Sequence, residues 1–161
     1  MDERDNQLVR MEEKLERIYN DITKIELNIL AEISEGKPTS TIYLYGSDGT
    51  LFYEHIDPKN KYSIEEQTKH ILDSKNILAV INAMYGWENK IQNFNGDKHI
   101  KDIPGSREVF FISIESVLFK KTMLWGLKRD KKGKIVFPLE TPDIINGEIG
   151  SRFTKDYFIR S

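Results

Sequence analysis

The first part of the chain carries apolar side chains at a regular alternation of three and four positions, with mostly polar residues between them. This spacing is a heptad repeat with apolar a and d positions, and it predicts one long amphipathic helix. Gly36 and Pro38 end the element, because glycine suits the position after a helix and proline cannot continue one. The stripe consists of Leu8, Met11, Leu15, Ile18, Ile22, Ile25 and Ile29.

This helix is longer than the rest of the chain is wide. About 30 residues at ~1.5 Å each give roughly 45 Å, whereas a domain of the remaining ~125 residues has a diameter of roughly 36 Å. We therefore expect a homo-oligomer assembled through a coiled-coil helix over residues 1–36, followed by a domain over residues 37–161. The alternative is an antiparallel hairpin with a second helix of the same chain. Leu27 and Leu30 widen the apolar face after Ile25, which indicates that this end docks on the domain.

The stretch from Thr41 to Ile56 has the pattern of a β-hairpin, with two β-rich runs on either side of Asp48-Gly49. An Asp-Gly pair is typical of a two-residue type I′ turn. The pairs predicted for this turn are Tyr45–Phe52, Leu44–Tyr53 and Ile42–His55. One face would then carry the aromatic residues Tyr43, Tyr45 and Phe52. Such a surface can stack on nucleic-acid bases, or it can be covered by helices.

Apolar residues keep a helical spacing from Ser63 to about Asn93, with a break near the sequence DSKN. Ser63 and Glu66 form a capping box, which marks the start of a helix. We predict one broken helix or two consecutive helices here. The run Ile77–Ile81 is also compatible with a buried strand, because periodicity does not separate the two in short apolar runs.

The C-terminal part predicts strands separated by turns. The β-rich runs are Arg107–Ile114, Thr122–Arg129 and Lys134–Glu140. Residues Ser116–Lys121 either extend the first run or form a short helical turn, and no element is assigned after Thr141. Together with the hairpin, these runs predict an antiparallel β-sheet of about five strands with one helical layer, preceded by the long N-terminal amphipathic helix. The expected class is α+β.

The composition narrows the class of protein further. The chain has 161 residues, of which 39% are hydrophobic and 31% charged, and it has no cysteine, which excludes disulfides and thiolate metal sites. No apolar run approaches the ~18 residues of a membrane span, and the acidic N-terminus is unlike a signal peptide. We expect a cytoplasmic protein that does not contact a membrane. Ile outnumbers Leu by 21 to 12, a bias typical of AT-rich genomes, and it suggests a bacterial or phage origin.

Charge is distributed unevenly along the chain. Residues 1–36 have a net charge of −5 and residues 107–161 a net charge of +4, although the whole chain is at −2. A basic C-terminal third suggests an anionic partner, or an acidic helix docked on its own basic domain. Its cations gather in the turn Lys128–Lys134, where they can also simply form the polar tip of a hairpin. An anion, nucleotide or nucleic-acid site here would use Arg107, Lys120, Lys121, Lys128, Arg129, Lys131, Lys132, Lys134, Ser151 and Arg152.

The tripeptide Gly-Ser-Arg occurs twice, at residues 105–107 and 150–152. Glycine allows a close backbone approach, and arginine binds phosphate through two donors. Two such loops would make an anion pocket if they converged, and the simpler interpretation is two unrelated surface turns.

Familiar catalytic patterns are missing from the sequence. It contains no G-x-S-x-G elbow, P-loop or G-x-G-x-x-G motif. Three histidines lie near carboxylates, in the groups His55/Asp57, His70/Asp73 and Asp97/His99/Asp102. Their spacings match no established zinc or manganese motif, so we predict no metal and no cofactor. Nothing in the sequence brings the carboxylates Glu115 and Glu140 together.

These observations favour a small, non-catalytic interaction protein. We expect a regulator, an inhibitor or an immunity-type protein that binds another macromolecule, with a protein as the first choice of partner. The alternative is a nucleic-acid or nucleotide-binding protein that uses the basic C-terminal third. A metal-dependent hydrolase that uses the histidine–aspartate groups is the third hypothesis.

Overall fold

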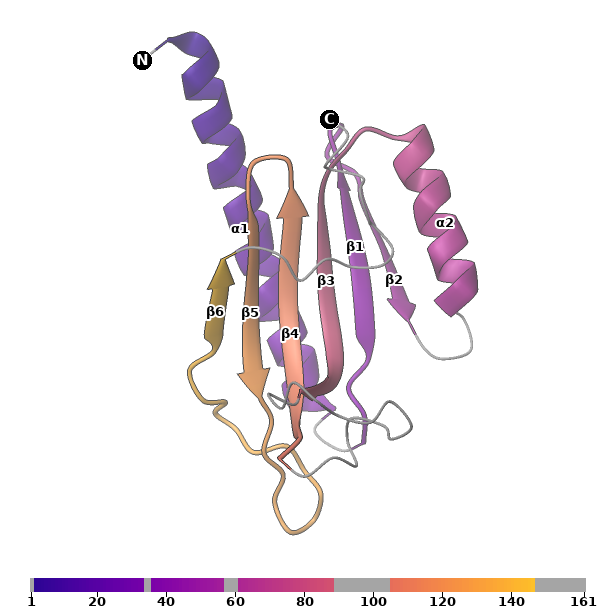
Figure 1. The fold of residues 1–161 in the computed structure, drawn as a ribbon, viewed down its shortest axis with the longest axis vertical. Helices are drawn as coiled ribbons and strands as arrows, with labels where there is room; N and C mark the ends of the chain where they lie inside the picture. The colour runs from indigo at the N-terminus through magenta and orange to yellow at the C-terminus, as the bar shows by residue number, and fades with distance from the viewer. Residues whose placement is uncertain (1, 34–35, 57–60, 89–104, 147–161) are drawn as a thin grey trace.

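The computed structural model describes residues 2–33, 36–56, 61–88 and 105–146, which form two helices and one sheet of six strands (Figure 1). The elements are α1 (Glu3–Glu32), β1 (Ser40–Gly46), β2 (Leu51–Ile56), α2 (Lys61–Ser74), β3 (Ile77–Glu88), β4 (Arg107–Ser116), β5 (Lys120–Gly126) and β6 (Asp143–Asn146). The strand order is β2-β1-β3-β4-β5-β6, and every neighbouring pair is antiparallel. The predicted α+β class is confirmed, with six strands in place of about five. Within these residues, neither helix combines the length and apolar character that crossing a membrane requires.

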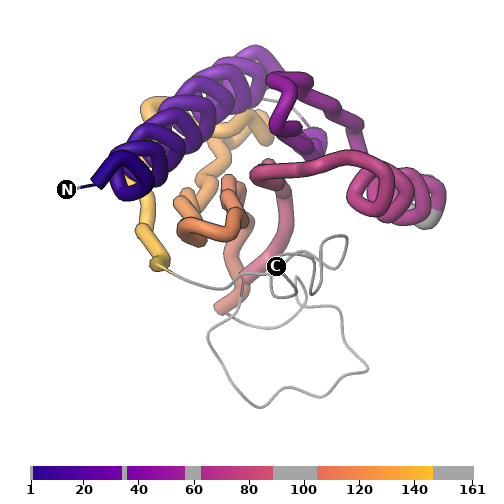
Figure 2. Tube along the Cα trace, turned by 90° about the horizontal axis from the view of Figure 1, so that it is seen from above, coloured from indigo at the N-terminus to yellow at the C-terminus, as the bar shows by residue number. Residues whose placement is uncertain are grey.

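The two helices cover opposite faces of the sheet (Figure 2). α1 crosses one face obliquely, since Glu16 on one flank pairs with Lys121 of β5, while Lys14 on the other flank lies 5.9 Å from the ring centre of Tyr45 on β1. α2 packs on the other face, where Ile64 joins a core with residues of β1 and β3. The sheet therefore has a helix on each face, whereas the sequence predicted one helical layer and a projecting helix.

α1 begins at an aspartate cap, in which the side chain of Asp2 accepts a hydrogen bond from the amide of Asp5 at 2.9 Å. Its first turns extend beyond the sheet (Figure 1), and from Met11 onward the helix packs on the core of its own chain. Tyr19 is completely buried, and its hydroxyl donates to the carbonyl of Ile112 on β4 at 2.5 Å. The helix thus docks much earlier than Ile25, where the sequence placed the start of docking.

The heptad stripe of α1 is shared between this core and solvent. Two of its residues, Leu15 and Ile22, are buried against the sheet, and Met11 and Ile18 pack at the edge of the same core. Ile29 is half-buried. Leu8 and Ile25 remain 46% and 52% exposed. Self-association through the stripe and the division at residue 36 stay predictions, since the structure contains a single chain.

The hairpin of β1 and β2 has a register one residue away from the predicted one. Gly46 donates to the carbonyl of Thr50 at 2.8 Å, and Gly49 adopts φ +87°, so the loop has three residues with a left-handed glycine at its end. The observed pairs are Tyr45–Leu51, Leu44–Phe52, Tyr43–Tyr53, Ile42–Glu54 and Thr41–His55. The predicted pairs are wrong, and Phe52 lies on the α2 face because a shift by one residue reverses the faces.

The second predicted helix ends much earlier than expected. α2 stops at Ser74, and Ile77–Glu88 forms the long central strand β3, so the strand interpretation of this apolar run is confirmed. Both faces of β3 are covered over most of its length, which explains why its sequence lacks the alternation of a half-exposed strand. The segment Lys134–Glu140 contributes only an isolated bridge between Ile135 and Arg129, and the sixth strand is β6, where the sequence predicted no element.

Candidate functional site

The two described arginines of the basic C-terminal third are bound to carboxylates. The guanidinium of Arg129 pairs with Glu108 at 2.7 and 2.8 Å, and it also donates to the carbonyls of Gly36 and Gly133. Arg129 thereby holds the pKa of Glu108 below its usual range. Burial, and then the hydrogen bond to Glu108, raise the pKa of Tyr85 to about 12. Arg129 thus fastens the basic turn to the segment after α1, and it is not directed at a ligand.

Arg107 lies on the other face of the sheet, where it pairs with Glu88 at 3.1 Å and with Asp143 at 3.3 Å. Its guanidinium covers Gly126, at which an added Cβ would come within 2.9 Å of it. The first Gly-Ser-Arg sequence therefore supplies a clamp between β3, β4 and β6. The second, with Ser151 and Arg152, lies outside the described residues, so the convergence of the two stays untested.

The predicted lysines do not form one surface. Lys120 and Lys121 lie at the opposite end of β5 from the turn at residues 128–134. Lys121 pairs with Glu16 of α1 at 3.5 Å, as expected for an acidic helix on a basic domain. Lys128 pairs with Glu140 at 2.5 Å.

The basic turn has the geometry of an ordinary hairpin tip. The side chain of Asp130 accepts hydrogen bonds from the amides of Lys132 and Lys134, and Gly133 adopts φ +82°. Lys131, Lys132 and Lys134 are exposed at this tip. These lysines do not line the hollow along α1, the cavity beside β2 and α2, or the small cavity near the end of α1.

The described histidines and carboxylates form no metal-binding group. Nδ1 of His55 lies 2.9 Å from the hydroxyl of Thr41, and His70 is exposed on α2. Glu115 is buried on β4, whereas Glu140 is exposed beside Lys128, so these carboxylates do not form a pair. Four candidates lie outside the described residues: Asp57, Asp97, His99 and Asp102.

The predicted aromatic surface is divided between two cores. Tyr43 and Tyr45 are buried on the α1 face, and Phe52 is partly buried on the α2 face. The hydroxyl of Tyr43 donates to the buried carboxylate of Glu26, and burial raises the pKa of Glu26. These three aromatic side chains therefore support the fold and offer no shared stacking surface.

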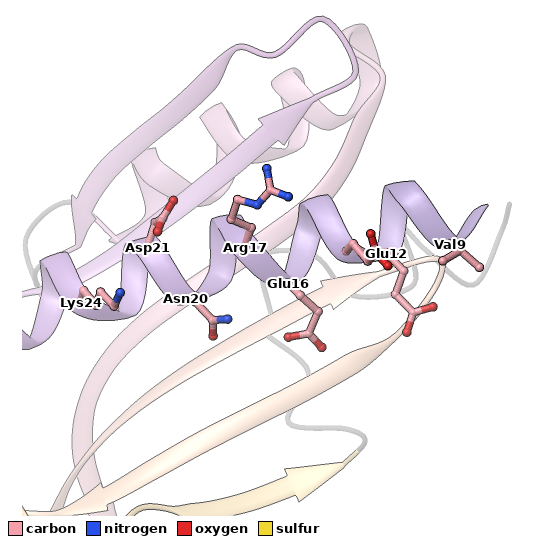
Figure 3. A pocket seen from close by; sticks show the side chains of 8 residues that line it. Val9, Glu12, Glu16, Arg17, Asn20, Asp21 and Lys24 are labelled. Carbon is pink, nitrogen blue, oxygen red and sulfur yellow. The ribbon is translucent and has the colours of Figure 1, made fainter. Parts of the chain in front are cut away.

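The surface of α1 that faces solvent has a shallow hollow along it (Figure 3). All of its lining residues come from the helix itself, and most are charged: Val9, Glu12, Glu13, Glu16, Arg17, Asn20, Asp21 and Lys24. A hollow with walls from a single helix is an ordinary solvated surface, and it indicates no ligand.

The outer edge of β2 is a further candidate surface, which the sequence patterns did not indicate. β2 is the last strand on its side of the described sheet (Figure 1). Because Gly46 and Thr50 form a hydrogen-bonded pair, every second pair along β1 and β2 is bonded, and Leu51 and Tyr53 lie in the pairs between. The amide and carbonyl groups of Leu51 and Tyr53 therefore point away from β1, toward the open edge.

An apolar surface adjoins this edge on the α1 side. Tyr53 is 61% exposed, and its ring centre lies 6.0 Å from that of the buried Tyr43. Ile18 and Ile25 are four and eleven positions after Lys14, so they share the flank of α1 on which Lys14 approaches Tyr45 of β1. The side chains of Leu51, Tyr53 and Ile25 thus leave an apolar strip exposed between α1 and the edge of β2.

A cavity adjoins the edge on the α2 side. It has a volume of about 120 Å³ and lies between β1, β2 and α2. Its lining is mostly apolar, with polar groups from Glu54, Gln67 and Thr68. The full set is Ile42, Leu44, Phe52, Tyr53, Glu54, Ile64, Gln67, Thr68 and Ile71. The open edge of β2 is therefore flanked by an apolar strip on one face and a cavity on the other.

Comparisons with known proteins add no further assignment, since no family model, no curated protein and no solved structure matches this chain.

Proposed function

We propose that this protein is a non-catalytic binding protein that takes up an extended segment of another protein as an additional strand beside β2. The open edge of β2 is the observation that carries the proposal. In strand addition, main-chain hydrogen bonds supply affinity, and pockets for alternate side chains supply specificity. Both are available here, because the amide groups of Leu51 and Tyr53 have no second strand partner in the described sheet and lie between the apolar strip and the cavity.

The sequence of β2 itself supports a binding role. Proteins usually protect edge strands from unwanted pairing with lysine, proline, bulges or short length. β2 has six residues, LFYEHI, with no lysine and no proline, and it exposes Leu51 and Tyr53. An edge that exposes Leu51 and Tyr53 can serve as a template for pairing with another chain. The other edge, β6, has only four residues, and its Asp143 is bound to Arg107.

The nucleic-acid alternative has less support from the described residues. Arg107, Arg129, Lys121 and Lys128 are paired with carboxylates of the same chain, which lowers the charge available to phosphates. The metal-dependent hydrolase has no described cluster of ligands to support it. Binding by strand addition needs neither unpaired basic side chains nor a cluster of metal ligands.

The proposal can be tested by selecting displayed random peptides, long enough to form a strand, against the full chain. Tyr53→Pro should abolish binding of the selected peptides, because proline removes the amide that points to the incoming strand and keeps the pairing with β1. Tyr53→Val is the matched control, since valine keeps this amide and suits a strand. Circular dichroism must show that both variants remain folded.

A second readout on the peptide is specific for strand addition. Methylating the amide nitrogens of a selected peptide one at a time should weaken binding at every second position, because alternate amides face β2. Selected peptides that bind Tyr53→Pro as well as Tyr53→Val would refute the proposal. Methylation effects without this alternation would refute it as well.

A further inference from the structure

We infer that the cavity between β2 and α2 is a specificity pocket that receives one lysine or arginine side chain of the added strand. The inference rests on the proposed function, since the side chain that enters the cavity belongs to the strand added beside β2. It adds a chemical class to the partner, namely an extended segment with a cation at a defined position.

The cavity combines an apolar interior with a polar rim. Phe52, Ile64 and Ile71 belong to the hydrophobic core on the α2 face, and their side chains line the cavity. Glu54 and Gln67 line it as well and are exposed, which places the carboxylate and the amide at its opening. About 120 Å³ is room for a single side chain, since one water molecule occupies ≈ 30 Å³ in the liquid.

Within the described part of the chain, the carboxylate of Glu54 has no ion-pair partner. No described lysine or arginine lines the cavity either. Most exposed acidic side chains elsewhere on a protein are simply solvated. Glu54 differs because it borders an apolar cavity next to an open strand edge, where an incoming chain would remove water from it.

The register of an added strand directs side chains into this cavity. Side chains alternate between the two faces of a sheet, so a residue opposite Tyr53 faces α1 and its two neighbours face α2. Those neighbours lie opposite Phe52 and Glu54, with Cβ atoms ≈ 4.5–5.5 Å away in directly opposed pairs. At least one side chain of the added strand must therefore lie over the cavity.

A long cationic side chain fits both parts of this cavity. Its methylene groups can pack on Phe52, Ile64 and Ile71 while its charged end reaches the rim. A purely apolar side chain would leave Glu54 without water or a partner, and an acidic one would meet a like charge. Arginine can also donate to the carboxylate of Glu54 and the amide oxygen of Gln67 together.

The peptides selected against the full chain provide the probe. A selected peptide and its copies with the cation replaced by norleucine or glutamate are measured against wild type, Glu54→Gln, Glu54→Lys and Glu66→Gln. Glu66 is the matched control, because it is an exposed glutamate of α2 that does not line the cavity. Glu54→Gln should weaken binding of the cationic peptide about tenfold, the effect of losing one charge-assisted hydrogen bond. Glu66→Gln should leave it unchanged.

Charge reversal gives the sharper result. Glu54→Lys should prefer the glutamate peptide over the cationic one, and wild type should show the opposite order. If Tyr53→Pro abolishes binding but no cation is selected and Glu54→Gln has no effect, the pocket assignment is wrong and the proposed function stands. If binding survives Tyr53→Pro, the proposed function itself is wrong.

Discussion

Leucines at two equivalent positions of the α1 heptad stripe should differ strongly in their contribution to stability. Leu8 and Leu15 both occupy a positions, and the sequence assigned both to an oligomer seam. In the structure, Leu15 is 1% exposed within the core, whereas Leu8 is 46% exposed where the helix extends beyond the sheet. Replacing each by alanine therefore makes the same chemical change in two different environments.

The expected magnitudes follow from these environments. Leu15→Ala removes a fully buried side chain and leaves a cavity, which costs about 3 kcal/mol of unfolding free energy. Leu8→Ala loses only part of the burial of one side chain and gains helix propensity, so its cost should stay below about 1 kcal/mol. Leu15→Ala should therefore be less stable than Leu8→Ala by about 2 kcal/mol or more.

Urea denaturation followed by circular dichroism measures both values, at two widely separated protein concentrations. We expect Leu15→Ala to lower the midpoint far more than Leu8→Ala at both concentrations, because Leu15 packs on the sheet of its own chain. Equal losses for Leu8→Ala and Leu15→Ala, with midpoints that rise with protein concentration, would refute this reasoning. They would indicate that α1 buries its stripe against another chain.

Three further substitutions test the polar groups of the fold. Burial raises the pKa of Glu26 in the folded state, so the contribution of Glu26 to the unfolding free energy should fall as the pH rises above 4.5. Glu26→Gln should remove this contribution, which urea titrations of both proteins over a range of pH would measure. Arg129→Ala should cost about 2 kcal/mol, because it leaves the partly buried Glu108 unpaired; a cost near zero would contradict the clamp. The side-chain amide of Asn82 is buried with no hydrogen-bond partner among the described residues, so Asn82→Leu should raise the melting temperature, with a gain of about 1 kcal/mol.

The sequence predicted that α1 is a helix, but it did not predict which of its positions are buried. The heptad pattern predicts a helix correctly, but the same stripe of a and d residues can face a sheet or a second helix. The structure buries Tyr19 and Glu26, which both follow the d position, and it leaves Ile25 at a d position exposed. Tyr19 was a signal that could have been used, since an aromatic e residue widens the stripe to the face of a globular helix. The burial of Glu26 depends on the hydroxyl of Tyr43, which no local pattern reveals.

The hairpin prediction was wrong by one residue in the register, and this shift changed which side chains share a face. An Asp-Gly pair fits a two-residue turn and also a three-residue loop in which glycine takes the left-handed position. The second option is realised at Gly49, and it moves Phe52 to the opposite face. The candidate site depends on this register, because it decides which amides of β2 point outward.

The candidate site itself could not be predicted from the sequence. The position of β2 at the sheet edge depends on the pairing of β1 with β3, and the sequence had favoured a helix for β3. Glu54 and Gln67 come together only because α2 packs across β2. Among the described residues, the cations that the sequence singled out lie on β4, on β5 and in the turn that follows β5, and Arg107, Lys121, Lys128 and Arg129 pair with carboxylates.

The most direct test of strand addition is amide hydrogen exchange along β2, measured by nuclear magnetic resonance with and without a selected peptide. In the free protein, the amides of Leu51 and Tyr53 should exchange fast, while those of Phe52 and Glu54, which face β1, exchange slowly. Saturating peptide should slow exchange at Leu51 and Tyr53. Unchanged exchange at Leu51 and Tyr53 with the peptide bound would contradict the account.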